Sequence, residues 1–132
     1  MELNKILIDT NIYSEFMRGD NKVRFILSEM EIIGISVISI GELLSGFKGG
    51  INEEKNRKEL SFFLDSPRVK VYNVDIETSE FYAKVITDLK NSGNPIPTND
   101  IWIAAIVFQN GLKLFTLDNH FQKVPGLFLI KY

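Results

Sequence analysis

The sequence predicts an α/β fold, a three-layer α/β/α sandwich with a central parallel sheet of about five strands. Short apolar runs alternate along the chain with longer segments whose apolar residues recur at helical spacing. Strands that alternate with helices form parallel sheets covered by helices on both faces. The length of 132 residues and the apolar content of 45%, without repeats or linkers, further indicate a single domain over residues 1–132.

In the first half of the chain, the expected strands are short apolar runs and the expected helices begin at capping residues. Gly19 ends the first helix, and Asp20 or Asn21 can cap the second. Glycines at 46, 49 and 50 then break the chain before Asn52 caps another helix. The predicted elements are a strand at 5–8, helices at 11–17 and 21–30, a strand at 31–35, and helices at 36–46 and 52–64.

In the second half, prolines and glycines separate the expected elements. Pro67 precedes a strand, and the loop 92–97 cannot continue a helix because proline lacks the N–H group and restricts its predecessor. Thr98 is expected to cap the next helix, and Gly111 to end it. The predicted elements are a strand at 69–74, helices at 77–91 and 98–110, a strand at 113–117, a turn at 119–123 and a strand at 127–130.

Four acidic residues lie beside these apolar segments. Asp9 and Asp118 each follow an expected strand directly, Glu42 lies in the apolar stretch 38–44, and Asp100 opens an apolar helix. Burying an unpaired charge is costly, and two carboxylates ~5 Å apart at an effective dielectric of ~20 repel by roughly 3 kcal/mol. If the four acids converge, a cation must hold them together, and hard divalent ions such as Mg²⁺ take oxygen ligands.

Each acid also has an ordinary structural explanation. Asp9, like the two residues after it, can cap a helix. Asp100 in a first helical turn complements the helix dipole, which is worth ~0.3–1 kcal/mol, and Asp118 suits a turn. Glu42 fits a helix surface less well, because no Lys or Arg lies within four residues to pair with it. The metal-site interpretation therefore depends on all four acids occurring together with apolar flanks.

The composition excludes several classes of protein. The absence of cysteine rules out disulfides, thiolate zinc sites and cysteine nucleophiles. Residues 1–5 show no basic start of a signal peptide, and the longest apolar run, Ile101–Phe108, is far shorter than the ~20 residues of a membrane helix. The chain is therefore expected to be soluble and cytoplasmic, and the missing cysteines suit a reducing compartment.

The net charge of −2 by itself argues against nucleic-acid binding. Setting the four acids aside leaves 13 acidic residues against 15 basic ones, and bound metal would neutralise the four. Arg18, Lys22 and Arg24 are then either RNA contacts or part of a solvated surface. A second basic group within 48–58 is interpreted as a solvated helix face, because acids are mixed into it.

Four motifs carry a resemblance to a known family. They lie at 7–11 (Leu-Ile-Asp-Thr-Asn), 38–43, 95–105 and 115–121, and the third is the most specific. With these motifs in this order and spacing, essentially the whole chain resembles PIN domains, and specifically the VapC-type toxin ribonucleases of type II toxin–antitoxin systems. The resemblance implies a PIN-like sandwich in which the catalytic metal ligands are Asp9, Glu42, Asp100 and Asp118, supported by Thr10, Asn11 and Thr116.

The resemblance also implies an activity, an endoribonuclease that depends on Mg²⁺ or Mn²⁺. The metal would lower the pKa of a water molecule, and the resulting hydroxide would attack phosphorus in line and leave 5′-phosphate and 3′-OH ends. Structured RNA, tRNA or rRNA, is the implied substrate, and a VapB-like antitoxin and a second copy of the chain are the implied partners. Residues of the two early helices are expected to line a partner groove or dimer face, or else to lie in the core: Ile12, Phe16, Met17 and Phe25.

Two other functions stay open at this point. One is a receiver-like metal-binding switch domain, although the adjacent acid pair and the late lysine of such domains are not clear here. The other is a non-catalytic PIN scaffold that binds RNA or protein, against which the intact acid set argues. The sole histidine, His120, is expected to be a surface or packing residue rather than a general base, and Trp102, Phe108 and Phe115 are expected in the core.

Overall fold

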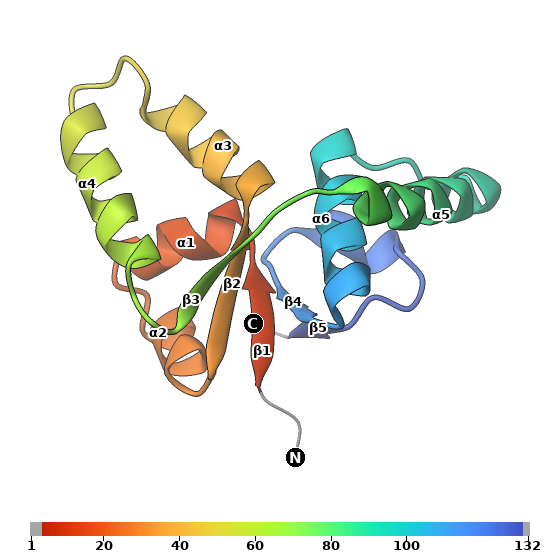
Figure 1. The fold of residues 1–132 in the computed structure, drawn as a ribbon, viewed down its shortest axis with the longest axis horizontal. Helices are drawn as coiled ribbons and strands as arrows, with labels where there is room; N and C mark the ends of the chain where they lie inside the picture. The colour runs from red at the N-terminus through yellow and green to blue at the C-terminus, as the bar shows by residue number, and fades with distance from the viewer. Residues whose placement is uncertain (1–3, 131–132) are drawn as a thin grey trace.

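The fold is built around one parallel sheet. The computed structural model describes residues 4–130; residues 1–3 and 131–132, which include part of the segment assessed for a signal peptide, lie outside the described residues. The strands of the described chain run parallel in the order β3-β2-β1-β4-β5, with helices packed around them (Figure 1). The expected α/β fold with a central parallel sheet is thereby confirmed.

Strands and helices follow one another in the order that the sequence predicts. The strands are β1 (Lys5–Ile8), β2 (Ile32–Ser36), β3 (Val69–Tyr72), β4 (Lys113–Phe115) and β5 (Leu129–Ile130). The helices are α1 (Thr10–Met17), α2 (Asn21–Ser28), α3 (Val37–Phe47), α4 (Glu53–Leu64), α5 (Ile76–Ser92) and α6 (Thr98–Asn110), with a short 3₁₀ helix, η1 (Asn119–Lys123).

The late strands are shorter than expected, and one helix cap is different. The expected strands at 69–74, 113–117 and 127–130 keep only the residues that pair with a neighbouring strand. A run of apolar residues does not reveal where its neighbour in the sheet ends. Thr98 is the first residue of α6 rather than its cap; Pro97 takes the capping position, and no side chain caps this helix.

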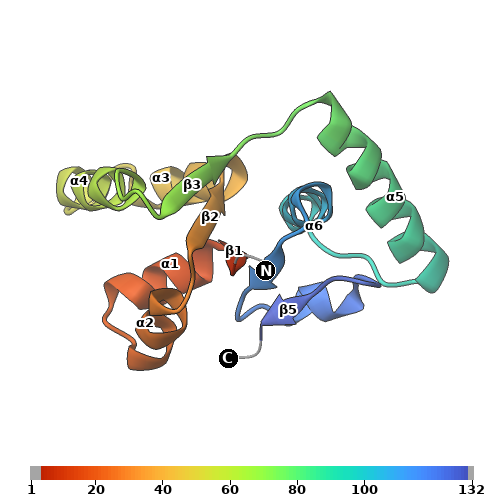
Figure 2. The ribbon, with the colours of Figure 1, turned by 60° about the horizontal axis from the view of Figure 1, so that its bottom comes forward.

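Successive residues of β1 face the two helical layers. Ile6 and Ile8 pack with residues of α1 to α4, whereas Leu7 packs with residues of α6 and η1, and all three side chains are fully buried. Figure 2 shows α1 to α4 on one side of the sheet and α5 and α6 on the other. A strand buried on both faces must be apolar throughout, which explains the unbroken run before Asp9.

The aromatic residues expected in the core differ in their burial. Phe115 on β4 is fully buried. Phe108 is partly buried and packs against the cluster between α5 and α6. Trp102 is also partly buried and lies against Tyr82, with ring centroids 4.2 Å apart.

In the described part of the chain, no helix has the length and apolar character that a bilayer-spanning segment needs.

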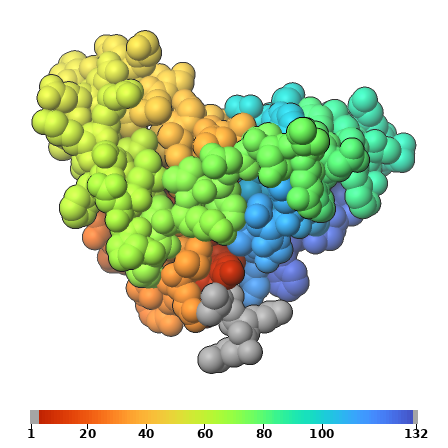
Figure 3. All heavy atoms as spheres, viewed as in Figure 1, coloured from red at the N-terminus to blue at the C-terminus, as the bar shows by residue number. Residues whose placement is uncertain are grey.

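The carboxyl ends of β1 and β4 meet at one edge of the sheet. Ile8 is paired with Phe115, so the next residues, Asp9 and Thr116, emerge side by side. The connection from β1 to β2 runs over one face of the sheet, and the connection that leads into β4 runs over the other. In parallel sheets, such a switch point is where ligands bind. Figure 3 shows the surface dipping between α3 and the start of α6. A hollow of about 510 Å³ there is lined by Val37, Ile38, Gly41, Glu42, Ser45 and Asn99.

Candidate active site

Asp9 lies where β1 ends and α1 begins. Its Oδ1 accepts a hydrogen bond from the Ile12 backbone N–H at 3.2 Å, and its Oδ2 accepts one from the Thr116 hydroxyl. The residue is only 5% exposed. Burial, with a smaller contribution from Asp118 and Asp100, raises the pKa of Asp9 to about 6, although both hydrogen bonds act in the opposite direction. Asp9 therefore caps a helix, as its position suggests, and also places a buried carboxyl beside other acids.

Thr116 connects Asp9 with Asp118. Its hydroxyl donates to Asp9, and the same oxygen accepts the backbone N–H of Asp118 at 2.9 Å. Thr116, directly after β4, thus contacts two of the predicted site residues, Asp9 and Asp118. The supporting role that the sequence resemblance implies for Thr116 stays a prediction, and this contact is the observation that motivates it.

Glu42 reaches the same edge of the sheet from α3. Its Oε1 accepts a hydrogen bond from the Thr10 hydroxyl at 2.9 Å, and its Oε2 accepts one from Asn99 Nδ2 at 3.4 Å. Unlike Asp9, Glu42 is exposed and lines the hollow between α3 and α6. Asn11, the third residue expected to support the acids, is exposed on the first turn of α1.

Asp100 and Asp118 converge on His120. Asp100 is in the first turn of α6, and Asp118 precedes η1, where its Oδ1 accepts the His120 backbone N–H at 2.9 Å. His120 Nδ1 is 3.0 Å from Asp100 Oδ2 and 3.0 Å from Asp118 Oδ1. Burial raises the pKa of Asp100, the hydrogen bond from His120 lowers it, and Asp118 and Glu42 raise it again.

Together these interactions join all four predicted acids in one electrostatic cluster. Asp118 and Asp100 raise the pKa of Asp9, and Glu42 raises the pKa of Asp100. Among the described residues, Arg18, Arg57, Lys58 and Lys84 pair with Glu15, Glu53, Glu54 and Asp88, which lie outside this cluster. Carboxylate oxygens at the carboxyl edge of a parallel sheet, one of them buried, are the donors that a hard divalent cation requires. The residues present therefore fit a divalent metal.

Two residues of the site were not assigned to it by sequence reasoning. Asn99 contacts Glu42, and His120 contacts both Asp100 and Asp118, although His120 was expected to be a surface or packing residue. The signal for Asn99 was its place directly before Asp100. The signal for His120 was its place two residues after Asp118, which the backbone hydrogen bond of η1 turns toward the acids.

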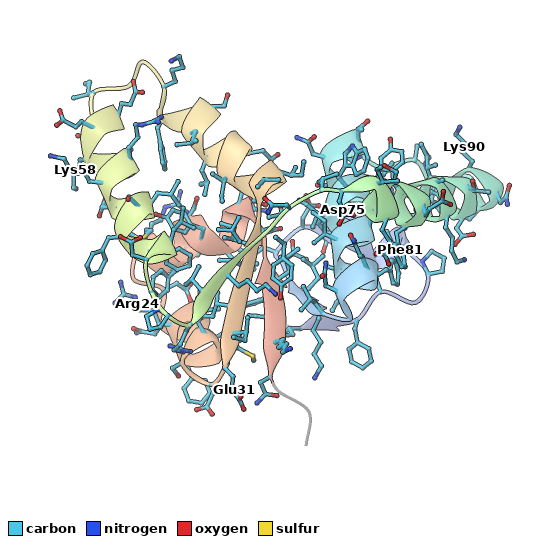
Figure 4. All side chains as sticks on the ribbon, viewed as in Figure 1. Arg24, Glu31, Lys58, Asp75, Phe81 and Lys90 are labelled. Carbon is cyan, nitrogen blue, oxygen red and sulfur yellow. The ribbon has the colours of Figure 1, made fainter. Side chains whose placement is uncertain are left out.

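The predicted RNA-contact residues lie away from the acids. Arg18 follows the last residue of α1 and pairs with Glu15, while Asp9 precedes the first, so a helix of eight residues, ~12 Å long, separates them. Arg24 donates to the Phe16 carbonyl oxygen at 3.2 and 3.3 Å and lies over the Phe16 ring. Lys22 is exposed on α2. Figure 4 labels Arg24 on the side of the molecule opposite α6.

The residues proposed to form a partner groove separate in the structure. Ile12 is fully buried and lies in the core, which corrects its place in the groove. Phe25 is 65% exposed and does not line the hollow that forms beside α1. That hollow, of about 470 Å³, lies between α1, α2 and α4 and is lined by Phe16, Met17, Arg24, Lys58, Glu59, Phe62 and Phe63.

Known proteins resemble this chain over nearly its whole length. Ribonuclease VapC4 of Mycobacterium tuberculosis is 30% identical, and the match covers 98% of each chain. Among solved structures, VapBC-1 from nontypeable Haemophilus influenzae has a TM-score of 0.85 at 26% identity and covers 96% of this chain and 97% of that one. VapBC2 from Rickettsia felis, bound to a DNA fragment from its promoter, superimposes with a TM-score of 0.88 at 24% identity, over 97% and 98% of the chains.

The PIN domain family matches residues 6–127, from within β1 to the loop before β5. This range includes every acid of the cluster and the sheet edge that brings the acids together. With that match and the relatives above, the chain belongs to the PIN domain family.

Proposed function

We propose that this protein is a divalent-metal-dependent endoribonuclease and the toxin of a type II toxin–antitoxin pair. The relatives named as VapC ribonucleases support the activity, and the solved VapBC complexes support the toxin assignment. The observation that carries the proposal is the buried carboxyl of Asp9, held beside Asp100 and Asp118 at the switch point of the sheet. A buried group with a pKa of about 6 next to two more acids is costly to the fold unless it serves a site.

In this proposal Asp9, Glu42, Asp100 and Asp118 hold the ion. When bound, a Mg²⁺ or Mn²⁺ ion supplies a nucleophile from water near neutral pH and neutralises charge on the phosphate. Thr116 keeps the Asp9 carboxylate turned toward Asp118, and Thr10 and Asn99 orient Glu42. Cleavage with water as the nucleophile leaves 5′-phosphate and 3′-OH ends.

The test is metal-dependent cleavage of RNA by the purified protein and its variants. Asp9→Asn and Asp100→Asn are expected to lower cleavage at least about 100-fold, the upper end of what losing a group that supports a metal ligand costs. Excess EDTA should stop the parent. Asp65→Asn is the matched control, because Asp65 is exposed at the end of α4. Cleavage that continues in EDTA, or full activity of a folded Asp9→Asn protein, would contradict the proposal.

The substrate class proposed is structured RNA, tRNA or rRNA. The relatives' ribonuclease names support RNA in general, and the sequence resemblance implies the structured class. Mapping RNA ends in cells that express the parent, beside cells that express Asp100→Asn, tests this. Parent-specific 5′-phosphate ends confined to loops of tRNA or rRNA are expected, and ends spread evenly over messenger RNA would contradict it.

We further propose that the antitoxin places an amphipathic helix in the hollow lined by Phe16, Met17, Phe62 and Phe63. Apolar side chains make up much of its lining, and Arg24, Lys58 and Glu59 line it as well, which suits a helix with one apolar face and a polar opposite face.

A second copy of the chain is the other partner proposed. Val71, Val74 and Ile76 leave exposed apolar side chains at the outer strand and the start of α5, and sedimentation equilibrium of the purified protein measures whether it dimerises.

A further inference from the structure

The place of His120 among the acids calls for an explanation. Nδ1 is 3.0 Å from one oxygen of Asp100 and 3.0 Å from one oxygen of Asp118. One ring nitrogen carries at most one proton, so it can donate a full hydrogen bond to only one of the two oxygens. Asp118 Oδ1 already accepts the His120 backbone N–H at 2.9 Å. If Nδ1 carries a proton, that proton serves only one of the two carboxylate oxygens. The other close contact between Nδ1 and a carboxylate oxygen then has no hydrogen between its atoms.

The same three residues have the spacing of metal ligands. Asp100, Asp118 and His120 each offer one ligand atom, and these atoms all lie within 4.8 Å of one another. Neighbouring ligands of an octahedral ion with bonds of about 2.1 Å are separated by about 3.0 Å. Both nitrogen–oxygen distances in the structure have this value. A metal ion in place of the proton would coordinate one atom from each of the three residues.

We propose that His120 is a direct ligand of the divalent ion through Nδ1, and that it biases the site toward Mn²⁺ over Mg²⁺. This inference rests on the proposed function, because it concerns the same metal site. Imidazole nitrogen binds first-row transition ions well, whereas Mg²⁺ prefers an all-oxygen set. His120 enters the cluster from a short helix whose first turn is tied to Asp118, so its backbone is already in position. With 46% of its side chain exposed, the ring can reach an ion that arrives from solvent.

Pulsed EPR of bound Mn²⁺ tests the ligand directly. His120 is the only histidine of the chain. In untagged protein in an amine-free buffer, any nitrogen modulation from an imidazole must therefore come from His120. The parent is expected to show this modulation and His120→Gln to lose it. His120→Gln should also weaken Mn²⁺ binding by at least about tenfold, the lower end of what losing a group around a metal costs, and change Mg²⁺ binding less. Gln122→Ala, on the same short helix, is the matched control and should keep the modulation.

Each outcome separates this inference from the proposed function. Mn²⁺ bound to the parent without nitrogen modulation would overturn the role of His120 and leave the four acids as the metal site. Failure of the parent to bind Mn²⁺ at all would overturn both. Equal losses of Mn²⁺ and Mg²⁺ affinity in His120→Gln would overturn the metal preference. The parent spectrum decides the ligand question even if the variant does not fold, since it requires no substitution.

Discussion

Thr116 and Asp9 illustrate how single side chains organise this site. The Thr116 hydroxyl lies between the Asp9 carboxylate and the Asp118 backbone amide, so one oxygen positions residues that are far apart in the sequence. Asp9 itself has two functions that oppose each other energetically. As a helix cap it stabilises α1, but as a buried acid near others it destabilises the fold whenever it ionises.

The cost of ionising Asp9 predicts a pH dependence in metal-free protein. Its folded pKa, about 6, lies above the ordinary value of 3.8, so the native state binds the proton more tightly than the unfolded state does. Native stability from this group is therefore present at low pH and is lost as pH rises through about 6, by about 3 kcal/mol in total. Asp9→Asn lacks this loss and should keep both hydrogen bonds, because its amide can accept from Ile12 and donate to Thr116.

Urea denaturation with a chelator, at about pH 4 and about pH 7.5, measures this effect. Asp9→Asn should be clearly more stable than the parent at the higher pH, and the difference should shrink at the lower pH. Subtracting the parent curve removes the contribution of other groups, such as Asp75, whose pKa is lowered by hydrogen bonds from Thr78 and Gln109. A stability difference that is the same at both pH values would contradict the assignment of the shift to Asp9.

At the scale of elements, close packing within the sheet limits which residues are possible. Gly34 lies in the middle of β2, between β1 and β3, and the edge of the Tyr72 ring packs against it. A methyl group on Gly34 would be 2.5 Å from Tyr72 Cε2 and 3.0 Å from the Ile6 carbonyl oxygen. The absence of a side chain at 34 is thus what lets Tyr72 cover the outer part of the sheet.

Gly34→Ala is expected to destabilise the protein by about 1–3 kcal/mol, since overpacking forces side chains or backbone to shift. Gly41→Ala is the matched control: its new methyl group meets nothing within 4 Å, and alanine inside α3 should add up to about 1 kcal/mol. Denaturant melts of both variants against the parent measure the two effects. A Gly34→Ala protein as stable as the parent would show that Tyr72 does not pack on β2 as described.

For the whole molecule, the hollow proposed for the partner lies between α1, α2 and α4, and none of the four acids is among the residues that line it. Phe62 and Phe63 are neighbours on α4, and only Phe63 is buried, where it packs against Tyr13 and Phe16. Phe62 is 84% exposed and lines the hollow. If the antitoxin binds this hollow as proposed, substitutions should be able to alter its binding without altering RNA cleavage.

Phe62→Asp is expected to weaken antitoxin binding while RNA cleavage stays at the parent level. Burial of a phenylalanine side chain contributes about 1.5–3 kcal/mol, so the dissociation constant should rise at least tenfold, about 1.4 kcal/mol. Copurification and titration with the cognate antitoxin measure binding. Phe25→Asp is the control, because Phe25 is exposed outside the hollow. Unchanged binding of Phe62→Asp, or an equal loss in Phe25→Asp, would place the groove elsewhere.

Much of the fold could be predicted because its signals are local. The apolar run 6–8, the capping residues and the glycines at 93 and 111, both left-handed at helix ends, lie within a few positions of what they determine. The signals for the four acids as a candidate site are likewise local, because each acid lies beside its own apolar neighbours. Ile12, Phe62 and His120 could not be placed this way, because burial and contact depend on elements distant in the sequence.

The sequence by itself determined the alternation of strands and helices and the positions of the four acids relative to them. Only the tertiary structure decided that β4 lies beside β1, so that Asp9 and Thr116 meet although 107 positions separate them. It also decided that η1 turns His120 toward Asp100 and that Ile12 faces the core. Strand pairing is chosen by the packing of both helical layers onto the sheet together, and no local run of residues carries that information.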